Sequence, residues 1–207
     1  MIVMNELEIP YELADFSSDT SKDHMRRIAD RAPEAYANHV MTRECENVWL
    51  CENPKSSVWH FYVALLPHCI LVYGDIGEMI IRPGSGCRMG WLRGCLDDGK
   101  SDSFEYMLGK VPAKHKQLEF MTGDVLLACE EYVVHNPEEA YRMQEALNNW
   151  ASLVGDYGNP QESWYSAASN ANLDPEWYSG YCCYDSEMYW CAYALQWFTA
   201  EWVKTNT

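Results

Sequence analysis

The sequence is poor in positive charge. It has 15 lysine and arginine residues against 31 aspartate and glutamate residues, which gives a formal net charge of −16. Proteins that bind nucleic acid directly need clustered cations to neutralise phosphates, and proteins that adsorb to anionic membranes need basic segments. The composition therefore argues against nucleic acid and against a membrane surface as direct partners.

Long apolar runs are lacking as well. No run approaches the roughly 20 residues of a membrane-spanning helix. The first ten residues contain Glu6 and Glu8 but no basic segment of the kind that begins a secretory signal. Hydrophobic residues nevertheless make up 48% of the 207 residues, which excludes a wholly disordered acidic chain. We therefore expect a folded protein without a secretory signal or a membrane span.

Paired cysteines at metal-binding spacing do not occur. The nine cysteines are irregularly spaced, with no C-x₂-C pair, and Cys182 and Cys183 are adjacent, so their side chains diverge. An odd number of cysteines without a secretory signal is typical of free thiols. The six histidines are scattered and form no H-x-x-x-H pair. We therefore expect no metal and no cofactor.

Established catalytic motifs are also missing. The glycine-rich segment 84–86 lacks the lysine of a phosphate-binding loop, and no G-x-S-x-G or H-E-x-x-H pattern occurs. The segment 74–77 (Gly-Asp-Ile-Gly) lies between two expected strands. Its Asp75, together with Glu78, could form a carboxylate site of a small enzyme. A hairpin turn with aspartate as a turn former is the favoured interpretation.

The segment from about 47 to 82 predicts a β-meander. Short apolar stretches rich in β-branched and aromatic residues are separated by turns at 53–54, 67–68 and 74–77. Gaps this short cannot accommodate a parallel crossover, so the three or four strands must be antiparallel. Their continuous apolar runs indicate that helices cover both faces.

The rest of the chain predicts helices. A helix begins near Ser21 and is broken at Pro33, with a second helical piece over 34–40. After residue 120, Asn136-Pro137 and Asn159-Pro160 have the form of helix starts. The segment 187–203 is apolar almost all round, which indicates a helix that is buried or that docks a second surface.

The expected fold class is therefore α+β, an antiparallel three- to four-stranded meander covered by a mainly C-terminal set of helices. We expect a single domain over residues 1–207. A subdivision into a sheet-containing part, 1–116, and an acidic helical part, 117–207, remains open, because about ninety residues could equally be the cover of the sheet.

The charge is unevenly spread along the chain. Residues 1–116 hold 17 acidic and 13 basic residues, a net of −4, whereas residues 117–207 hold 14 acidic and 2 basic residues, a net of −12. Unpaired like charges destabilise a fold by repulsion. An acidic surface improves solubility, and it also complements a basic partner, where it raises the association rate and sets specificity.

Aromatic residues are concentrated in the same part of the sequence. Most of them fit a buried core, but those between 177 and 184 lie in a stretch without helical periodicity. Tryptophan and tyrosine are the common anchors of protein interfaces. The candidate partner-binding residues are therefore five glutamates and two aromatic anchors: Glu130, Glu131, Glu138, Glu139, Glu145, Trp177 and Tyr178.

Two short segments carry a family resemblance. Residues Leu66–Gly77, which include the motif Tyr-Gly-Asp-Ile-Gly, and residues Met89–Gly94, which include Gly-Trp-Leu-Arg-Gly, resemble small accessory proteins of tailed bacteriophages and prophages. The resemblance covers about thirty residues and brings no catalytic residue with it. It implies a phage origin and the cytoplasm of a bacterial host. Acidic phage proteins of this size resemble inhibitors of host defence, including anti-CRISPR proteins.

These observations favour a non-enzymatic phage inhibitor. It would bind a host defence complex of the CRISPR type at a basic nucleic-acid-binding surface, and its carboxylates would lie where phosphates bind. Two alternatives are a small enzyme with a site at Asp75 and Glu78, and a homo-oligomeric phage accessory protein, for example a homodimer, whose aromatic surface is its own subunit interface.

Overall fold

The chain folds into two compact units. The computed structural model describes residues 7–14, 20–84, 89–96, 101–112, 118–157, 159–173 and 182–206. One unit, called the helical unit below, comprises residues 1–24 and 118–183. The other, called the sheet unit, comprises residues 25–117 and 184–207. Each unit therefore combines segments that are far apart in the sequence.

The sheet unit contains the expected antiparallel meander. Its strands occur in the order β1-β2-β3-β4-β5, and each pairs antiparallel with the next. The strands are β1 (Val40–Cys45), β2 (Val48–Glu52), β3 (Phe61–Leu66), β4 (Cys69–Gly74) and β5 (Gly77–Ile81). The α+β class and the meander are confirmed, and the described sheet has one strand more than the expected three or four.

The additional strand is β1, which the sequence pattern does not predict. Its side chains are mostly exposed, so the alternation of apolar and polar residues that marks a half-buried strand is missing. The helix before it, α2 (Ser21–Tyr36), runs through Pro33 instead of breaking there. Pro33 lies in the last turn, where few backbone hydrogen bonds remain to be lost. The expected helical piece over 34–40 therefore divides between the end of α2 and the beginning of β1.

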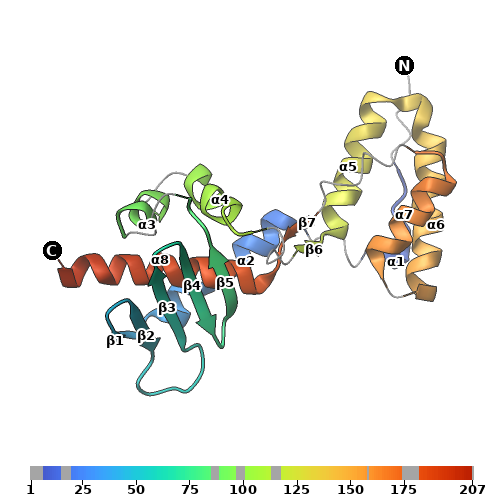
Figure 1. Cartoon of the computed structure of the whole chain (residues 1–207). Helices are drawn as coiled ribbons and strands as arrows, with labels where there is room; N and C mark the ends of the chain where they lie inside the picture. The colour runs from blue at the N-terminus through green and yellow to red at the C-terminus, as the bar shows by residue number, and fades with distance from the viewer. Residues whose placement is uncertain are drawn as a thin grey trace. The chain divides into compact units, whose positions relative to one another are not determined.

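The last helix, α8 (Ser186–Asn206), covers one face of the sheet (Figure 1). Every second residue of the central strands faces α8. The fully buried residues on this face include Cys51, Phe61, Val63, Ile70 and Val72. Two short helices, α3 (Met89–Leu96) and α4 (Ser101–Gly109), belong to the same unit, and α3 also contacts α8.

The other face of the sheet is less well covered than the apolar runs of the sequence indicate. Leu50, Tyr62, Leu71 and Ile80 point to this face and are partly exposed. The rings of Tyr62 and Tyr73 stack there with their centroids 4.9 Å apart. The expectation that helices cover both faces is therefore wrong for the described residues, in which this face is only partly covered.

The aromatic side chains of α8 are mostly core residues. Tyr189 and Trp190 are buried, and the Trp190 ring lies 4.5 Å from that of Trp59 and 6.1 Å from that of Tyr36. Phe104 on α4 packs against Tyr193 at 5.1 Å. Because neighbours surround the helix, its nearly continuous apolar circumference is explained by burial within the unit.

The helical unit has a separate core. Its elements are α1 (Tyr11–Ala14), β6 (Leu118–Phe120), α5 (Thr122–His135), the 3₁₀ turn η2 (Pro137–Glu139), α6 (Ala140–Tyr157) and α7 (Pro160–Asn170). Strand β7 (Cys182–Tyr184) pairs with β6, and its first two residues belong to this unit. Helices α5, α6 and α7 bury Val125, Met143, Trp150 and Trp164 together with Leu13 of α1. The main chain of Glu8 and the side chain of Gln144 also exchange two hydrogen bonds, which hold the N-terminal segment to α6.

The two Asn-Pro sequences begin helices in different ways. Asn159 caps α7, because its Oδ1 accepts hydrogen bonds from the backbone N–H groups of Gln161 and Glu162. Asn136 instead donates from Nδ2 to the carbonyl of Tyr132, and a 3₁₀ turn precedes α6. Both starts occur where the sequence predicts them, and only Asn159 forms a side-chain cap.

The division into units differs from the subdivision at residue 116 in two respects. Helix α8 belongs with the sheet, because its apolar residues fill the sheet's core, and the first 24 residues belong with α5–α7. In the described ranges, no helix combines the length and the apolar character needed to cross a bilayer.

Candidate functional site

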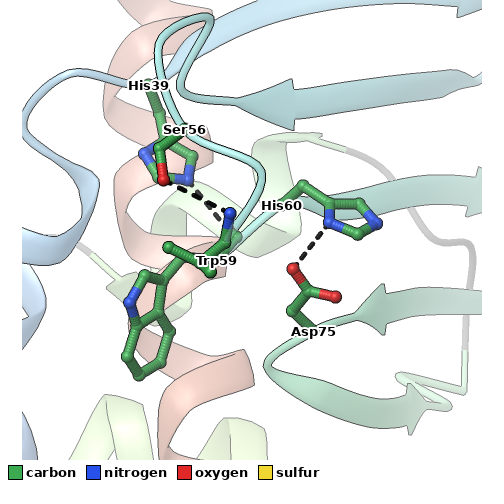
Figure 2. A network of polar contacts seen from close by, with 6 residues as sticks. His39, Ser56, Trp59, His60 and Asp75 are labelled. Atoms are coloured by element: carbon green, nitrogen blue, oxygen red, sulfur yellow. Dashed lines mark hydrogen bonds and ion pairs between the residues drawn. The ribbon is translucent and has the colours of Figure 1, made fainter.

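The turn between β4 and β5 brings Asp75 against a histidine. The Nδ1 atom of His60 lies 2.7 Å from Oδ2 of Asp75, and both side chains are about two-fifths exposed (Figure 2). A carboxylate only accepts hydrogen bonds, so Nδ1 donates, and in the neutral form of the ring Nε2 is the acceptor nitrogen. This is the arrangement in which a carboxylate orients a histidine that acts as a general base.

Glu78 is not part of this pair. It lies on β5 opposite Tyr73, whereas the partner of Asp75 is His60. The structure adds His60 as the hydrogen-bond partner of Asp75. A site that also includes Glu78 stays a prediction from the sequence. In the described ranges, no group of three or more His, Cys, Asp or Glu side chains is arranged to hold a metal ion.

The two glycines of the turn allow it to pack tightly. Gly74 has φ +152°, and a Cβ there would lie 2.4 Å from the carbonyl oxygen of His60. Gly77 has φ +103°, and a Cβ there would lie 2.6 Å from Cβ of Glu187 on α8. Between them, Ile76 is buried. The turn at 74–77 is thus held between β3 and α8, and its two glycines have a packing role.

The loop before His60 contains a strained residue. Trp59 has φ +67°, which is unfavourable for a bulky side chain. Its carbonyl oxygen lies 2.9 Å from Nε2 of His39, so this nitrogen is the donor (Figure 2). The ring of Trp59 packs on Trp190, and Ser56 Oγ accepts from the N–H of Val58. These contacts position His60 at the beginning of β3.

Six cysteines are free thiols, as the sequence predicts: Cys45, Cys51, Cys69, Cys95, Cys129 and Cys191. Burial raises the pKa of the Cys51, Cys129 and Cys191 thiols above the usual range. These three therefore stay protonated at neutral pH and are poor nucleophiles. None of them lies beside His60 in the contacts of the described residues.

The second candidate site is the surface of the helical unit, where the charge is concentrated. This unit holds 17 acidic residues against two basic ones, Lys22 and Arg142, a net of −15. The sheet unit holds 14 acidic and 13 basic residues, a net of −1. The folded units therefore separate the charge more sharply than a cut at residue 116 does, because the acidic first 24 residues join the helical unit.

The five candidate glutamates lie on consecutive elements of this unit. Glu130 and Glu131 are on α5, Glu138 and Glu139 are in η2, and Glu145 is on α6. Four of them are exposed to solvent, whereas Glu139 is only a quarter exposed and forms an ion pair with Arg142 at 3.1 Å. One of the two bases of the unit is thus already paired, and Glu139 is the weakest of the five as a partner-binding residue.

Exposed apolar side chains are interleaved with these glutamates. Leu127 and Val134 flank Glu130 and Glu131 at helical spacing on α5, and they are 55% and 58% exposed. Tyr141 precedes Glu145 by one turn on α6 and is 80% exposed. The two aromatic anchors expected from the sequence, Trp177 and Tyr178, lie outside the described residues.

The acidic residues near the start and the end of α8 have contacts close to them in the chain or in the sheet. Asp185 caps the helix by accepting from the N–H of Met188, Glu187 packs on Gly77, and Glu201 pairs with Lys204 at 2.5 Å. All three belong to the sheet unit. The carboxylates of residues 117–207 are therefore divided between the two units, and Asp185, Glu187 and Glu201 have local structural contacts in the sheet unit.

Comparisons of the chain with known protein families, with curated proteins and with solved structures find no match in any of the three.

Proposed function

We propose that the protein is a non-enzymatic phage inhibitor that acts in the cytoplasm of a bacterial host. It binds the basic, nucleic-acid-binding surface of a defence complex of the CRISPR type, and the helical unit makes the contact. The observation that supports this most directly is the separation of charge, with a net of −15 on the helical unit and −1 on the sheet unit.

Such a separation has a physical cost that points to a partner. Like charges on a unit of ninety residues repel one another and lower its stability. Solubility alone needs only a net charge well away from zero on the whole chain. A cleft lined with lysine and arginine attracts this unit as it attracts phosphates, and it raises the association rate most at low ionic strength. The acidic unit then excludes nucleic acid from the cleft.

The apolar residues among the glutamates supply the second element of an interface. Leu127, Val134 and Tyr141 are exposed, and neither α5 nor α6 buries them within the described unit. Interfaces gain affinity from a few apolar or aromatic anchors surrounded by polar residues. The carboxylates account for attraction and specificity, and these three side chains account for part of the affinity.

Removing four exposed carboxylates should slow binding to the target. In the variant Glu130→Gln/Glu131→Gln/Glu138→Gln/Glu145→Gln, we expect the association rate with the captured target to fall by about tenfold or more at low salt. The dissociation rate should change less. The target is first isolated by affinity capture from the bacterial host and mass spectrometry, and the rates are then measured by surface plasmon resonance over a series of salt concentrations.

A matched variant controls for charge as such. Glu34, Glu44, Glu46 and Glu105 are also exposed, but they belong to the sheet unit. Changing these four to glutamine removes the same charge from the chain and should leave the association rate within about twofold of the wild type. Equal effects of the two variants, or binding indifferent to salt and to competing DNA, would contradict the proposal. A solution mass of a stable homodimer with no captured target would favour the homo-oligomeric accessory protein.

The hydrogen bond between His60 and Asp75 supports a second candidate function. A partly exposed histidine oriented by a carboxylate can remove a proton from water or from a substrate hydroxyl group. The sheet unit would then be the catalytic part of a small enzyme.

The two functions make opposite predictions for one variant. His60→Ala/Asp75→Asn removes the pair but leaves the glutamates intact, so inhibition of CRISPR interference against an invading plasmid should be unchanged. The four-glutamate variant should lose inhibition in the same assay. The reverse pattern, with circular dichroism showing both variants folded, would favour the enzyme.

A further inference from the structure

A hollow of about 530 Å³ lies in the sheet unit at the end of the face that α8 covers. The β1–β2 hairpin, the beginning of α3 and the last turn of α8 form its walls. Its volume lies within the range of about 300–1,000 Å³ that small-molecule sites occupy. None of its lining residues belongs to the acidic helical unit or to the His60–Asp75 pair.

Two tryptophans form aromatic walls of this hollow. Trp49 of β2 is held by Phe198 of α8, whose ring lies 5.4 Å away in an edge-to-face contact. Trp202 comes from the last turn of α8, and Met89 from the first residue of α3. Indole rings of this kind provide flat surfaces on which a planar aromatic ring can stack.

A cation sits beside these rings in a fixed position. The register pairs Arg43 of β1 with Trp49, and the guanidinium carbon lies 5.9 Å from the Trp49 ring centroid. Arg43 Nε and Nη2 donate to the carbonyls of Cys45 and Glu46 at 3.2 and 2.5 Å. These bonds orient the guanidinium and leave other N–H groups for an anion, which a guanidinium binds in a bidentate manner.

Amide side chains complete the lining. Asn206 donates from Nδ2 to the carbonyl of Trp202 at 2.9 Å, so its Oδ1 can still accept a hydrogen bond. Asn47 lines the hollow from the hairpin turn. Amides next to aromatic surfaces hydrogen-bond the polar edge of a stacked heterocycle.

We infer that this hollow binds a nucleotide-like molecule, a flat aromatic ring that carries a phosphate or a carboxylate. The ring stacks on the partly exposed indole of Trp202, beside the largely buried Trp49, the anionic group pairs with Arg43, and the amides hydrogen-bond the edge of the ring. The lining residues of the hollow include one cation, Arg43, and one acidic residue, Glu46, so the lining does not carry the excess of negative charge by which the helical unit would repel an anion.

Calorimetry and ligand-observed NMR on the full chain test this inference with defined probes. The probes are the four ribonucleoside 5′-monophosphates, their nucleosides, inorganic phosphate and indole-3-acetate. We expect saturable binding of at least one monophosphate, with its nucleoside and inorganic phosphate each at least about tenfold weaker. If indole-3-acetate binds better than every nucleotide, the natural ligand is an aromatic carboxylate. The absence of saturable binding by every probe that joins a ring to an anion overturns the inference.

Variants then place the binding in the hollow. Trp202→Ala and Arg43→Gln should each weaken the best probe by about tenfold, and Arg43→Lys should weaken it less. Trp91→Ala and Lys55→Gln, which change a tryptophan and a cation of the same unit outside the hollow, should leave affinity unchanged. Because Arg43→Gln also removes bonds to the hairpin, Trp202→Ala decides the outcome if that variant unfolds. Affinity unaffected by Trp202→Ala overturns the assignment.

Discussion

The Gly74→Ala variant is expected to lose about 3 kcal/mol of unfolding free energy in the sheet unit. At φ +152°, residues other than glycine carry a backbone strain of about 1–3 kcal/mol. The added methyl group would also overlap the carbonyl oxygen of His60 at 2.4 Å and the Cα of Phe61 at 2.7 Å. Both neighbours are backbone atoms of β3, so the sheet itself must shift to make room.

Two other glycines of the same unit separate strain from overlap. Gly84 also has a positive φ, +88°, but no atom lies near its added Cβ, so Gly84→Ala should cost only about 1 kcal/mol. Gly94 lies within α3 with open space around it, and Gly94→Ala should stabilise by up to about 1 kcal/mol.

Urea denaturation, with hydrogen exchange of the β3 and β4 amides as the local probe, measures all three variants. From the most to the least stable, the expected order is Gly94→Ala, wild type, Gly84→Ala and Gly74→Ala. A Gly74→Ala variant as stable as Gly84→Ala would mean that the turn does not contact His60 as described.

Trp150→Ala should have a comparable effect on the helical unit, with a loss of about 3–5 kcal/mol. Trp150 is fully buried between α6 and α7, its ring lies 4.9 Å from that of Trp164, and its Nε1 donates to the carbonyl of Pro160 at 2.9 Å. Alanine would leave a large cavity and remove the hydrogen bond to Pro160. Hydrogen exchange of the α5–α7 amides should report the loss.

Two further variants provide stability losses with which that of Trp150→Ala can be compared. Trp150→Phe keeps most of the buried ring but loses the hydrogen bond, so its effect should be intermediate. Tyr141→Ala removes a side chain that is 80% exposed and should change stability by less than about 0.5 kcal/mol. If Trp150→Ala left the protection of α6 unchanged, the core described for this unit would be wrong.

The meander was predictable because its signals are local. Strands β2–β5 are short, apolar and separated by turns that contain proline or glycine, and short gaps force antiparallel pairing. Strand β1 was not predictable in this way, because its exposed side chains carry no alternating pattern. The passage of α2 through Pro33 depends on how close that residue is to the end of the helix.

The pairing of Asp75 with His60 could have been predicted from the sequence. A hairpin that turns at Pro67 and His68 pairs Leu66 with Cys69, and counting outward pairs Phe61 with Gly74. The next position outward places His60 beside Asp75. Counting the register from the expected turn would therefore have identified this pair, whereas proximity in the sequence pointed to Glu78.

The charge separation and the hollow depend on long-range packing. Nothing local assigns the acidic first 24 residues to α5–α7, because that depends on Leu13 entering their core. In the same way, Trp49 and Trp202 lie 153 positions apart in the sequence and line one hollow only because α8 covers the sheet. The proposed partner-binding residues Trp177 and Tyr178 remain predictions from the sequence.

The assignment of α8 to the sheet has a consequence for synthesis on the ribosome. Strand β5 ends at Ile81, and residues 82–185 must be made before the helix that covers the sheet. At a synthesis rate of about 5–20 residues per second, the apolar face of the sheet stays uncovered for roughly 5–20 s. During that interval the nascent chain presents Phe61, Val63 and Val72 to the surroundings, so its yield should depend on chaperones that bind emerging apolar segments.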